Sequence, residues 1–98
     1  MIEIRKTEVF TKWFENLNDR RAKARIQARI DRAEMGSFGD VAPVGEGVSE
    51  FRIFYGPGYR VYFVQKGPVL IILLSGGDKA SQKSDIAKAK KIATQLEA

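Results

Sequence analysis

The amino-acid sequence predicts a single domain of the α+β class, formed by residues 1–98. A chain of 98 residues can bury one hydrophobic core but is too short for two domains of ordinary size. Apolar residues make up 44% and charged residues 30% of the chain, a composition typical of folded soluble proteins. Helical periodicity dominates the first third, strand-like segments follow, and a helical segment closes the chain. This separation of helices from strands is typical of α+β folds.

The N-terminal third predicts one short strand and two helices. Residues 2–6 alternate apolar and charged side chains, as an edge strand does. Thr7 can cap a first helix, whose apolar face consists of Val9, Phe10, Trp13, Phe14 and Leu17. Asp19 can cap a second helix, which ends at Gly36 and has an apolar stripe of Ala22, Ile26, Ile30 and Ala33. The connection between the two helices is short, so we expect an antiparallel helical hairpin.

Another stripe of the second helix carries four arginines, Arg21, Arg25, Arg29 and Arg32. These side chains could bind phosphate or an acidic partner. The alternative is an ordinary solvated helix face with acidic residues nearby, and the frequency of exposed helical arginines favours it.

The following segments predict a loop, three strands and a last helix. Residues 36–47 are rich in glycine, which predicts an irregular connection. Strands are expected at 48–55, 59–66 and 69–75, and the continuous apolar run of the last one predicts a central strand. Gly76 and Gly77 predict a turn from strand to helix, with a phosphate-binding loop as the alternative. Ser81 or Ser84 can cap the final helix, whose apolar side consists of Ile86, Ala89, Ile92, Ala93 and Leu96.

The first two of these strands form a predicted β-hairpin whose register decides where its arginines point. A three-residue loop (56–58) places Tyr55 opposite Tyr59, whereas a two-residue loop (57–58) places it opposite Arg60. With the three-residue loop, one face is wholly apolar or aromatic: Phe51, Ile53, Tyr55, Tyr59, Val61 and Phe63. We favour this register, because the shorter loop would bury a guanidinium without a partner.

The other face of the hairpin gathers charged and aromatic side chains: Glu50, Arg52, Phe54, Arg60, Tyr62 and Val64. Arginines interleaved with rings suit RNA, because guanidinium groups bind phosphate and rings stack on bases. The alternative is an ion pair of Glu50 with Arg52 or Arg60 on a partly hydrated sheet face. Composition alone favours the ion pair, since cross-strand charge pairs are frequent in antiparallel sheets.

Charge and composition narrow the range of functions. Seventeen Lys and Arg stand against twelve Asp and Glu, and residues 48–98 carry +4 of the net charge of +5, which is compatible with a polyanionic partner. The absence of Cys and His excludes disulfides and argues against zinc chemistry. The N-terminus lacks the apolar run of a signal peptide, and the longest apolar run, residues 69–74, is too short to span a bilayer. We therefore expect a cytoplasmic protein without a membrane anchor.

The segments "GDVAPVGEGVSEFRI", "YGPGYRVYF" and "GGDK" resemble a known family in their order and spacing. The chain is similar to the RelE/ParE superfamily of toxins from toxin–antitoxin systems, and most similar to its HigB-like addiction module killer proteins, also called phage Gp49-like. The resemblance extends from about Phe10 to Ala93. It implies an α+β domain with an N-terminal strand, two helices, three further strands in a mainly antiparallel sheet, and a C-terminal helix. It also implies cleavage of mRNA, commonly on the ribosome, and neutralisation by a cognate antitoxin.

The same resemblance implies the site residues. In this family, basic residues of the concave sheet face and of the loop after the last strand contact the scissile phosphate, and the matching positions are Arg52, Arg60 and Lys79. Cleavage through the 2′-hydroxyl also needs a base and an acid. We expect Glu50 as the base and Lys79 as the acid or a further phosphate contact, without a metal ion or small-molecule cofactor. Further RNA contacts are expected from Phe54, Tyr62, Lys66 and Lys83.

One departure from the family keeps other functions open. Several RNA-cutting relatives carry a histidine or tyrosine near the C-terminus that assists proton transfer, and residues 84–98 contain neither. The ParE toxins share the fold, lack the ribonuclease constellation and inhibit DNA gyrase by direct contact, so the fold alone does not choose between the activities. A non-toxic member that only binds an antitoxin is a third alternative.

Overall fold

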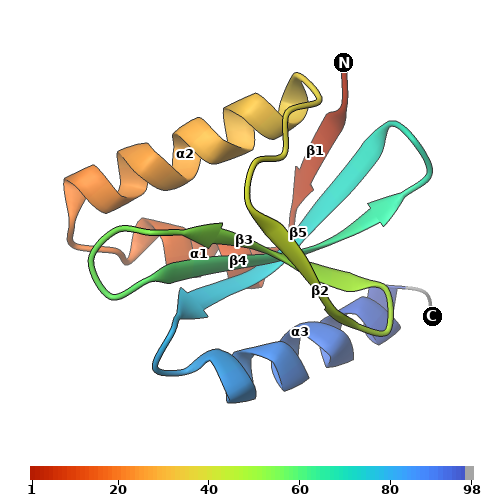
Figure 1. Cartoon of the computed structure of the whole chain (residues 1–98). Coiled ribbons are helices and arrows are strands. Elements are labelled where there is room, and N and C mark those ends of the chain that lie inside the picture. The colour runs from red at the N-terminus through yellow and green to blue at the C-terminus, as the bar shows by residue number, and fades with distance from the viewer. Residues whose placement is uncertain (97–98) are drawn as a thin grey trace.

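The computed structural model describes residues 1–96 of the chain (Figure 1). Its elements follow in the order β1 (Glu3–Lys6), α1 (Glu8–Glu15), α2 (Arg20–Glu34), β2 (Val41–Gly45), β3 (Val48–Ile53), β4 (Tyr59–Lys66), β5 (Leu70–Asp78) and α3 (Gln82–Leu96). The α+β class is confirmed, and so are the N-terminal strand, the two early helices, the three later strands and the C-terminal helix.

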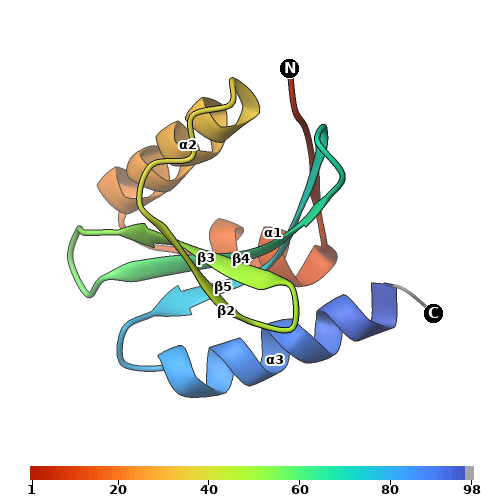
Figure 2. The same ribbon diagram turned by 45° about the vertical axis from the view of Figure 1, so that its right-hand side comes forward.

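A five-stranded sheet forms the centre of the molecule, with the strand order β1-β5-β4-β3-β2. β1 pairs with β5 in parallel, and all other neighbours are antiparallel. β5 lies inside the sheet, as its continuous apolar run predicted. Figures 1 and 2 show α2 on one side of the sheet and α3 on the other. The loop between β3 and β4 lies at the opposite end of the molecule from the turn between β4 and β5.

The caps predicted for the first two helices are confirmed. Thr7 Oγ1 accepts the backbone N–H of Phe10 at 3.1 Å. Asp19 Oδ1 accepts those of Arg21 and Ala22 at 2.9 and 3.2 Å. All four residues of the apolar stripe predicted for α2 are buried. Local sequence signals therefore determine where these two helices begin and which face of α2 turns inward.

One strand, β2, is absent from the sequence prediction. The irregular connection predicted for residues 36–47 is wrong for 41–45, which form β2 and pair with β3. Glu46 and Gly47 join the two strands with φ values of +55° and +78°, the backbone of a tight hairpin turn that follows the strand twist. Pro43 is tolerated because β2 is an edge strand. The glycines on either side of β2 hid the strand from the sequence pattern.

A hydrophobic core lies on each face of the sheet. The core under α1 and α2 contains Phe10, Ile26, Ile30, Ala33, Phe51, Ile53, Val61, Phe63, Ile71 and Leu73. The smaller core under α3 contains Val48, Tyr62, Val64, Leu74 and Ala89. The hairpin face predicted to be apolar therefore contributes to the first core, and the face predicted to be polar lies against α3.

The Gly76–Gly77 pair belongs to β5, so the turn from strand to helix predicted there is wrong. A Cβ at Gly76 would collide with the Trp13 ring of α1, and a Cβ at Gly77 would collide with the Asp85 carboxylate of α3. The missing side chains allow one helix to approach each face of the strand. The turn lies at residues 79–81 instead, and α3 begins directly after Ser81, one of the two predicted caps.

Candidate functional site

The register of β3 and β4 places two arginines opposite each other. Arg52 pairs with Arg60, and Glu50 pairs with Tyr62. The loop spans residues 54–58, two more than predicted, and an even shift keeps every strand residue on the same face. The predicted division into an apolar and a polar face is therefore confirmed, although the predicted cross-strand partners are wrong.

The longer loop removes Phe54 from the polar face. Phe54 follows the end of β3 and is 76% exposed, so the prediction that its ring lies between the arginines is wrong. Gly56 and Gly58 have φ values of +56° and +80°, a conformation that glycine adopts without steric penalty. This left-handed backbone closes a wider loop, which the Gly-Pro-Gly pattern did not distinguish from a tight one.

The Glu50 carboxylate lies close to both guanidiniums. Its Oε2 atom is 4.0 Å from Arg52 Nε and 3.8 Å from Arg60 Nε. Asp40 Oδ1 lies 3.5 Å from the same Arg52 nitrogen. Gln82 of α3 donates from Nε2 to both Glu50 oxygens, at 3.0 and 3.1 Å. The ion pair that composition favoured is therefore present, and it includes both arginines.

α3 covers most of this cluster. The side chains of Glu50 and Arg60 are only 4% and 7% exposed, whereas that of Arg52 is 36% exposed. A partly hydrated face is therefore wrong for the first two residues, because the apolar side of α3 packs on the same face of the sheet. Arg60 also donates from Nη1 to the carbonyl oxygens of Gly58 and Tyr59, each at 3.2 Å. These bonds hold its guanidinium beneath the hairpin loop.

Tyr62 is enclosed at the centre of the same face. Its side chain is buried, and its hydroxyl has no hydrogen-bond partner among residues 1–96. Burial raises the pKa of Tyr62, the charges of Glu50 and Asp85 raise it further, and Arg60 opposes the rise. A direct contact between this ring and RNA, as predicted, has no room while α3 is in place.

Lys79 lies at the rim of the cluster. A Cβ placed on Gly58 would be 3.4 Å from Lys79 Cβ and 3.5 Å from Arg60 Nη1, so the two residues flank this glycine. The Lys79 N–H donates to the Pro57 carbonyl at 3.4 Å, which joins the segment after β5 to the hairpin loop. The Lys79 side chain is exposed. The structure therefore brings all four predicted catalytic residues together: Glu50, Arg52, Arg60 and Lys79.

The two other lysines predicted to contact RNA have different positions. Lys66 ends β4, whereas Arg60 is near its start, and about 3.3 Å per residue separates the two by roughly 20 Å along the strand. Lys83 is exposed in the first turn of α3, next to Gln82. Lys83 therefore lies on the helix that covers the cluster, while Lys66 lies at the far end of the sheet.

Sequence reasoning missed Asp40, Gln82 and Asp85. Asp40 directly precedes the unpredicted β2. Gln82 and Asp85 begin α3, where Asp85 accepts the Ser81 hydroxyl at 2.5 Å and lies against Gly77. The helical period could have identified Gln82 and Asp85. Positions 82, 85, 86 and 89 share one face of a helix, so both residues extend the apolar side of α3 toward the sheet.

Over residues 1–96, no three or more His, Cys, Asp or Glu side chains gather closely enough to hold a metal ion. In the same part of the chain, no helix is both long and apolar enough to cross a membrane. The charged groups at the site are its arginines, its lysine and its carboxylates.

Fold and site together define a small α+β protein that carries an arginine and glutamate cluster between a β-hairpin and its C-terminal helix. A profile of the family described as "Phage derived protein Gp49-like" matches residues 12–97, and the chain belongs to this family of toxin-like proteins. A protein of Haemophilus influenzae, described as uncharacterized, is 48% identical over 95 residues, which cover 97% of this chain and 96% of that protein. The Gp49-like part of the sequence resemblance is thereby confirmed.

Proposed function

We propose that this protein is the toxin of a type II toxin–antitoxin system, a HigB-like member of the RelE/ParE superfamily. Its activity is the endonucleolytic cleavage of ribosome-bound mRNA, which arrests translation. Membership of the Gp49-like family supports the assignment of this protein as a toxin. The main observation in favour of nuclease activity is that Arg52 and Arg60 lie opposite each other on neighbouring strands. The Glu50 carboxylate lies beside both, and Lys79 lies at the rim.

The proposed reaction is a transesterification at the RNA backbone. The ribose 2′-oxygen attacks the adjacent phosphorus, the bond from phosphorus to the 5′-oxygen breaks, and the products carry a 2′,3′-cyclic phosphate and a 5′-hydroxyl. A base accepts the proton of the 2′-hydroxyl, and an acid gives a proton to the leaving 5′-oxygen. Arginines stabilise the charge that develops on the phosphate oxygens through charged hydrogen bonds.

Exposure separates the residues that contact RNA from those that support them. We assign Arg52 and the exposed Lys79 to the scissile phosphate, with Lys79 also protonating the leaving oxygen. Arg60 is enclosed and acts through its charge and by positioning Glu50. Glu50 is the proposed base, and substrate has to displace the Gln82 amide from its oxygens before the 2′-hydroxyl can reach it.

A translation extract primed with a reporter mRNA tests this activity. Wild-type protein should produce new 5′ ends within the translated message, and Arg52→Ala should lower the cleavage rate by roughly 100-fold or more. Arg5→Ala is the matched control, because Arg5 also pairs with a carboxylate, Glu3, but is 63% exposed on the edge strand β1. It should cut at the wild-type rate. An intact message on ribosomes saturated with wild-type protein would contradict the nuclease.

The burial of Glu50 and Arg60 favours a second candidate function. An enclosed cluster is less suited to chemistry on RNA than to holding α3 on the sheet, as expected of a ParE-like toxin that binds and inhibits DNA gyrase. In a supercoiling assay such a toxin would block gyrase at stoichiometric concentration, and Arg52→Ala would retain the block. Undiminished supercoiling at saturating protein excludes this candidate.

Both candidates require a cognate antitoxin as a protein partner. We expect a neighbouring gene to encode it, and co-expression of that gene product should restore growth after induction of this protein. A complex recovered by affinity purification through a tag on this protein would accompany the rescue. Normal growth of cells that accumulate the folded protein alone would argue for a non-toxic, antitoxin-binding member and against both candidates.

A further inference from the structure

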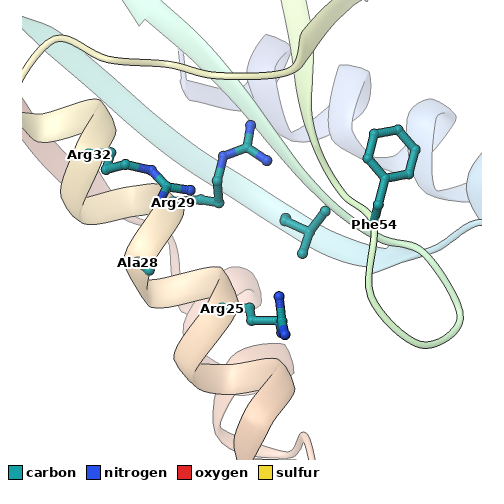
Figure 3. Close-up of a pocket in the computed structure, with 6 residues that line it drawn as sticks. Arg25, Ala28, Arg29, Arg32 and Phe54 are labelled. Atoms are coloured by element: carbon teal, nitrogen blue, oxygen red, sulfur yellow. The ribbon is translucent and has the colours of Figure 1, made fainter.

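A positively charged hollow lies on the face of the sheet opposite to the Arg52 and Arg60 cluster. It measures about 270 Å³, and its walls are formed by α2 and the end of β3: Arg25, Ala28, Arg29, Arg32, Ile53 and Phe54. Figure 3 shows the three arginines along α2 on one side and Phe54 across the hollow from them. The hollow therefore contains three of the four arginines in the stripe predicted on this helix.

Within residues 1–96, two of these arginines have no acidic side chain in direct contact. Among residues 1–96, neither Arg25 nor Arg32 forms an ion pair with a carboxylate. The carboxylate of Asp31 accepts a hydrogen bond from Gln27, and that of Asp40 pairs with Arg52. Both side chains are exposed, as expected of a solvated helix face, but no carboxylate among residues 1–96 is in direct contact with either guanidinium.

Arg29 forms part of the wall and contributes charge. Its guanidinium donates to the carbonyl oxygens of Phe38, Asp40 and Arg52 at 3.0, 2.9 and 2.6 Å. Burial lowers the pKa of Arg29, the nearby charge of Arg32 lowers it further, and the Asp40 carboxylate opposes the shift. Arg29 stays protonated at neutral pH, so a bound anion would relieve the repulsion between the two guanidiniums.

Arg25 and Arg32 have donors available for such an anion. The Arg25 guanidinium lies 4.7 Å from the centroid of the Tyr55 ring, a stacked position that occupies its face and leaves its N–H groups at the edge. Seven residues, about two helical turns, separate Arg25 from Arg32, so both lie on one side of α2. The small Ala28 between them keeps the hollow open.

Phe54 adds a second kind of recognition. Its ring is 76% exposed, which is unusual for so large an apolar side chain, and it borders a hollow that contains three guanidiniums. Aromatic rings beside arginines bind nucleotides, because the ring stacks on the base while the guanidinium binds the phosphate.

We propose that this hollow binds a nucleotide, with its phosphate on Arg25 and Arg32 and its base stacked on Phe54. A phosphate joined to an aromatic base occurs both in a free mononucleotide and in one unit of an RNA chain. The hollow lies on the other face of the sheet from the Arg52 cluster, so nucleotide binding there does not require RNA cleavage.

Ala28→Glu tests the site, with Ala24→Glu as its matched control. Both positions are exposed on α2 one turn apart, but only Ala28 lines the hollow, and each substitution adds one negative charge to a helix that tolerates Glu. The full chain is titrated with fluorescent AMP and, separately, with a labelled RNA of about five nucleotides. Ala28→Glu should weaken binding by about 10-fold or more, while the control stays within about 3-fold of wild type. Thermal unfolding verifies that both variants are folded.

Further variants identify the source of the nucleotide and separate the two faces. Phe54→Ala should weaken AMP binding by about 5-fold or more and leave the affinity for inorganic phosphate unchanged. Arg52→Ala should bind AMP like wild type whether or not it cuts RNA. Binding of AMP supports a free nucleotide as ligand, whereas binding of RNA alone, weakened by Ala28→Glu, supports an RNA chain. Equal loss in Ala28→Glu and Ala24→Glu, or no binding of either probe, would overturn the site.

Discussion

The two faces of the central sheet differ in what they bury. Under α1 and α2, Phe51 stacks on Phe63 with ring centroids 4.3 Å apart, and Phe38 lies 6.1 Å from each of them. Under α3, a smaller apolar cluster surrounds the Glu50 carboxylate, the Arg60 guanidinium and the Tyr62 hydroxyl. Four buried polar atoms on this face have no hydrogen-bond partner among residues 1–96: Arg52 Nε, Arg60 Nε, Tyr62 Oη and Ser75 Oγ.

This difference indicates a division of roles between the faces. Apolar burial stabilises a fold in proportion to area, whereas buried charges gain little net stability once desolvation is counted. The aromatic face therefore supplies most of the hydrophobic stabilisation. The face under α3 keeps polar groups that a domain built for stability alone would replace, which is expected of a functional site.

The largest expected effect on stability belongs to the aromatic face. Phe51→Ala should lower the free energy of unfolding by about 3–5 kcal/mol, because it removes a fully buried ring from the stack with Phe63. Phe54→Ala, which removes an exposed ring, should change it by less than about 0.5 kcal/mol. Urea unfolding followed by circular dichroism measures both. Equal effects of the two substitutions would contradict the assignment of this core.

On the opposite face, Glu50→Ala should lower the free energy of unfolding by on the order of 3 kcal/mol, because the buried Arg60 guanidinium would lose its carboxylate partner. Glu3→Ala, at the exposed pair with Arg5, should cost at most about 1 kcal/mol. The double variant Glu50→Leu with Arg60→Met should recover most of the stability and still fail to cut RNA. A double variant as unstable as Glu50→Ala would show that the cluster is required for folding, against the division of roles.

The two adjacent glycines of β5 compare the faces directly. Gly76→Ala should destabilise by about 2 kcal/mol, because the Trp13 ring that it meets is rigid. Gly77→Ala should cost about 1 kcal/mol or less, since the Asp85 carboxylate can rotate away. Thermal unfolding of the two variants measures the difference. The reverse order would mean that Asp85 is fixed in place, and Gly77→Ala combined with Asp85→Ala would then recover stability.

The smallest effect concerns the pH dependence of stability. The pKa of Tyr62 is raised in the folded protein. The protonated hydroxyl therefore contributes stability that is fully present below the unfolded pKa of about 10 and is lost as the pH rises toward the folded pKa. Tyr62→Phe should change stability little at pH 7, because the hydroxyl has no partner among residues 1–96. It should also lose less stability than wild type at higher pH. Melting temperatures recorded from pH 8 to 11 would run parallel for the two proteins if this hydroxyl were accessible to water.

The sequence predicted most of the fold, because helix signals and strand alternation are local. The caps at Thr7 and Asp19, the stripe of α2 and the apolar face of the hairpin all follow from neighbouring residues. β2 was missed, because an edge strand flanked by glycines has the composition of a loop. The length of the 54–58 loop was also missed, since it depends on which cross-strand pairs form and not on the turn residues alone.

For the candidate site, the sequence by itself determined that Glu50, Arg52 and Arg60 share one face of the hairpin, and it determined the family to which the chain belongs. Only the tertiary structure decided that Glu50 and Arg60 are enclosed, while Arg52 is partly exposed and Lys79 is exposed. The physical reason is that burial of the cluster depends on where α3 packs. That position depends on apolar contacts between distant parts of the chain and on the close approach that Gly77 permits, and no local pattern contains this information.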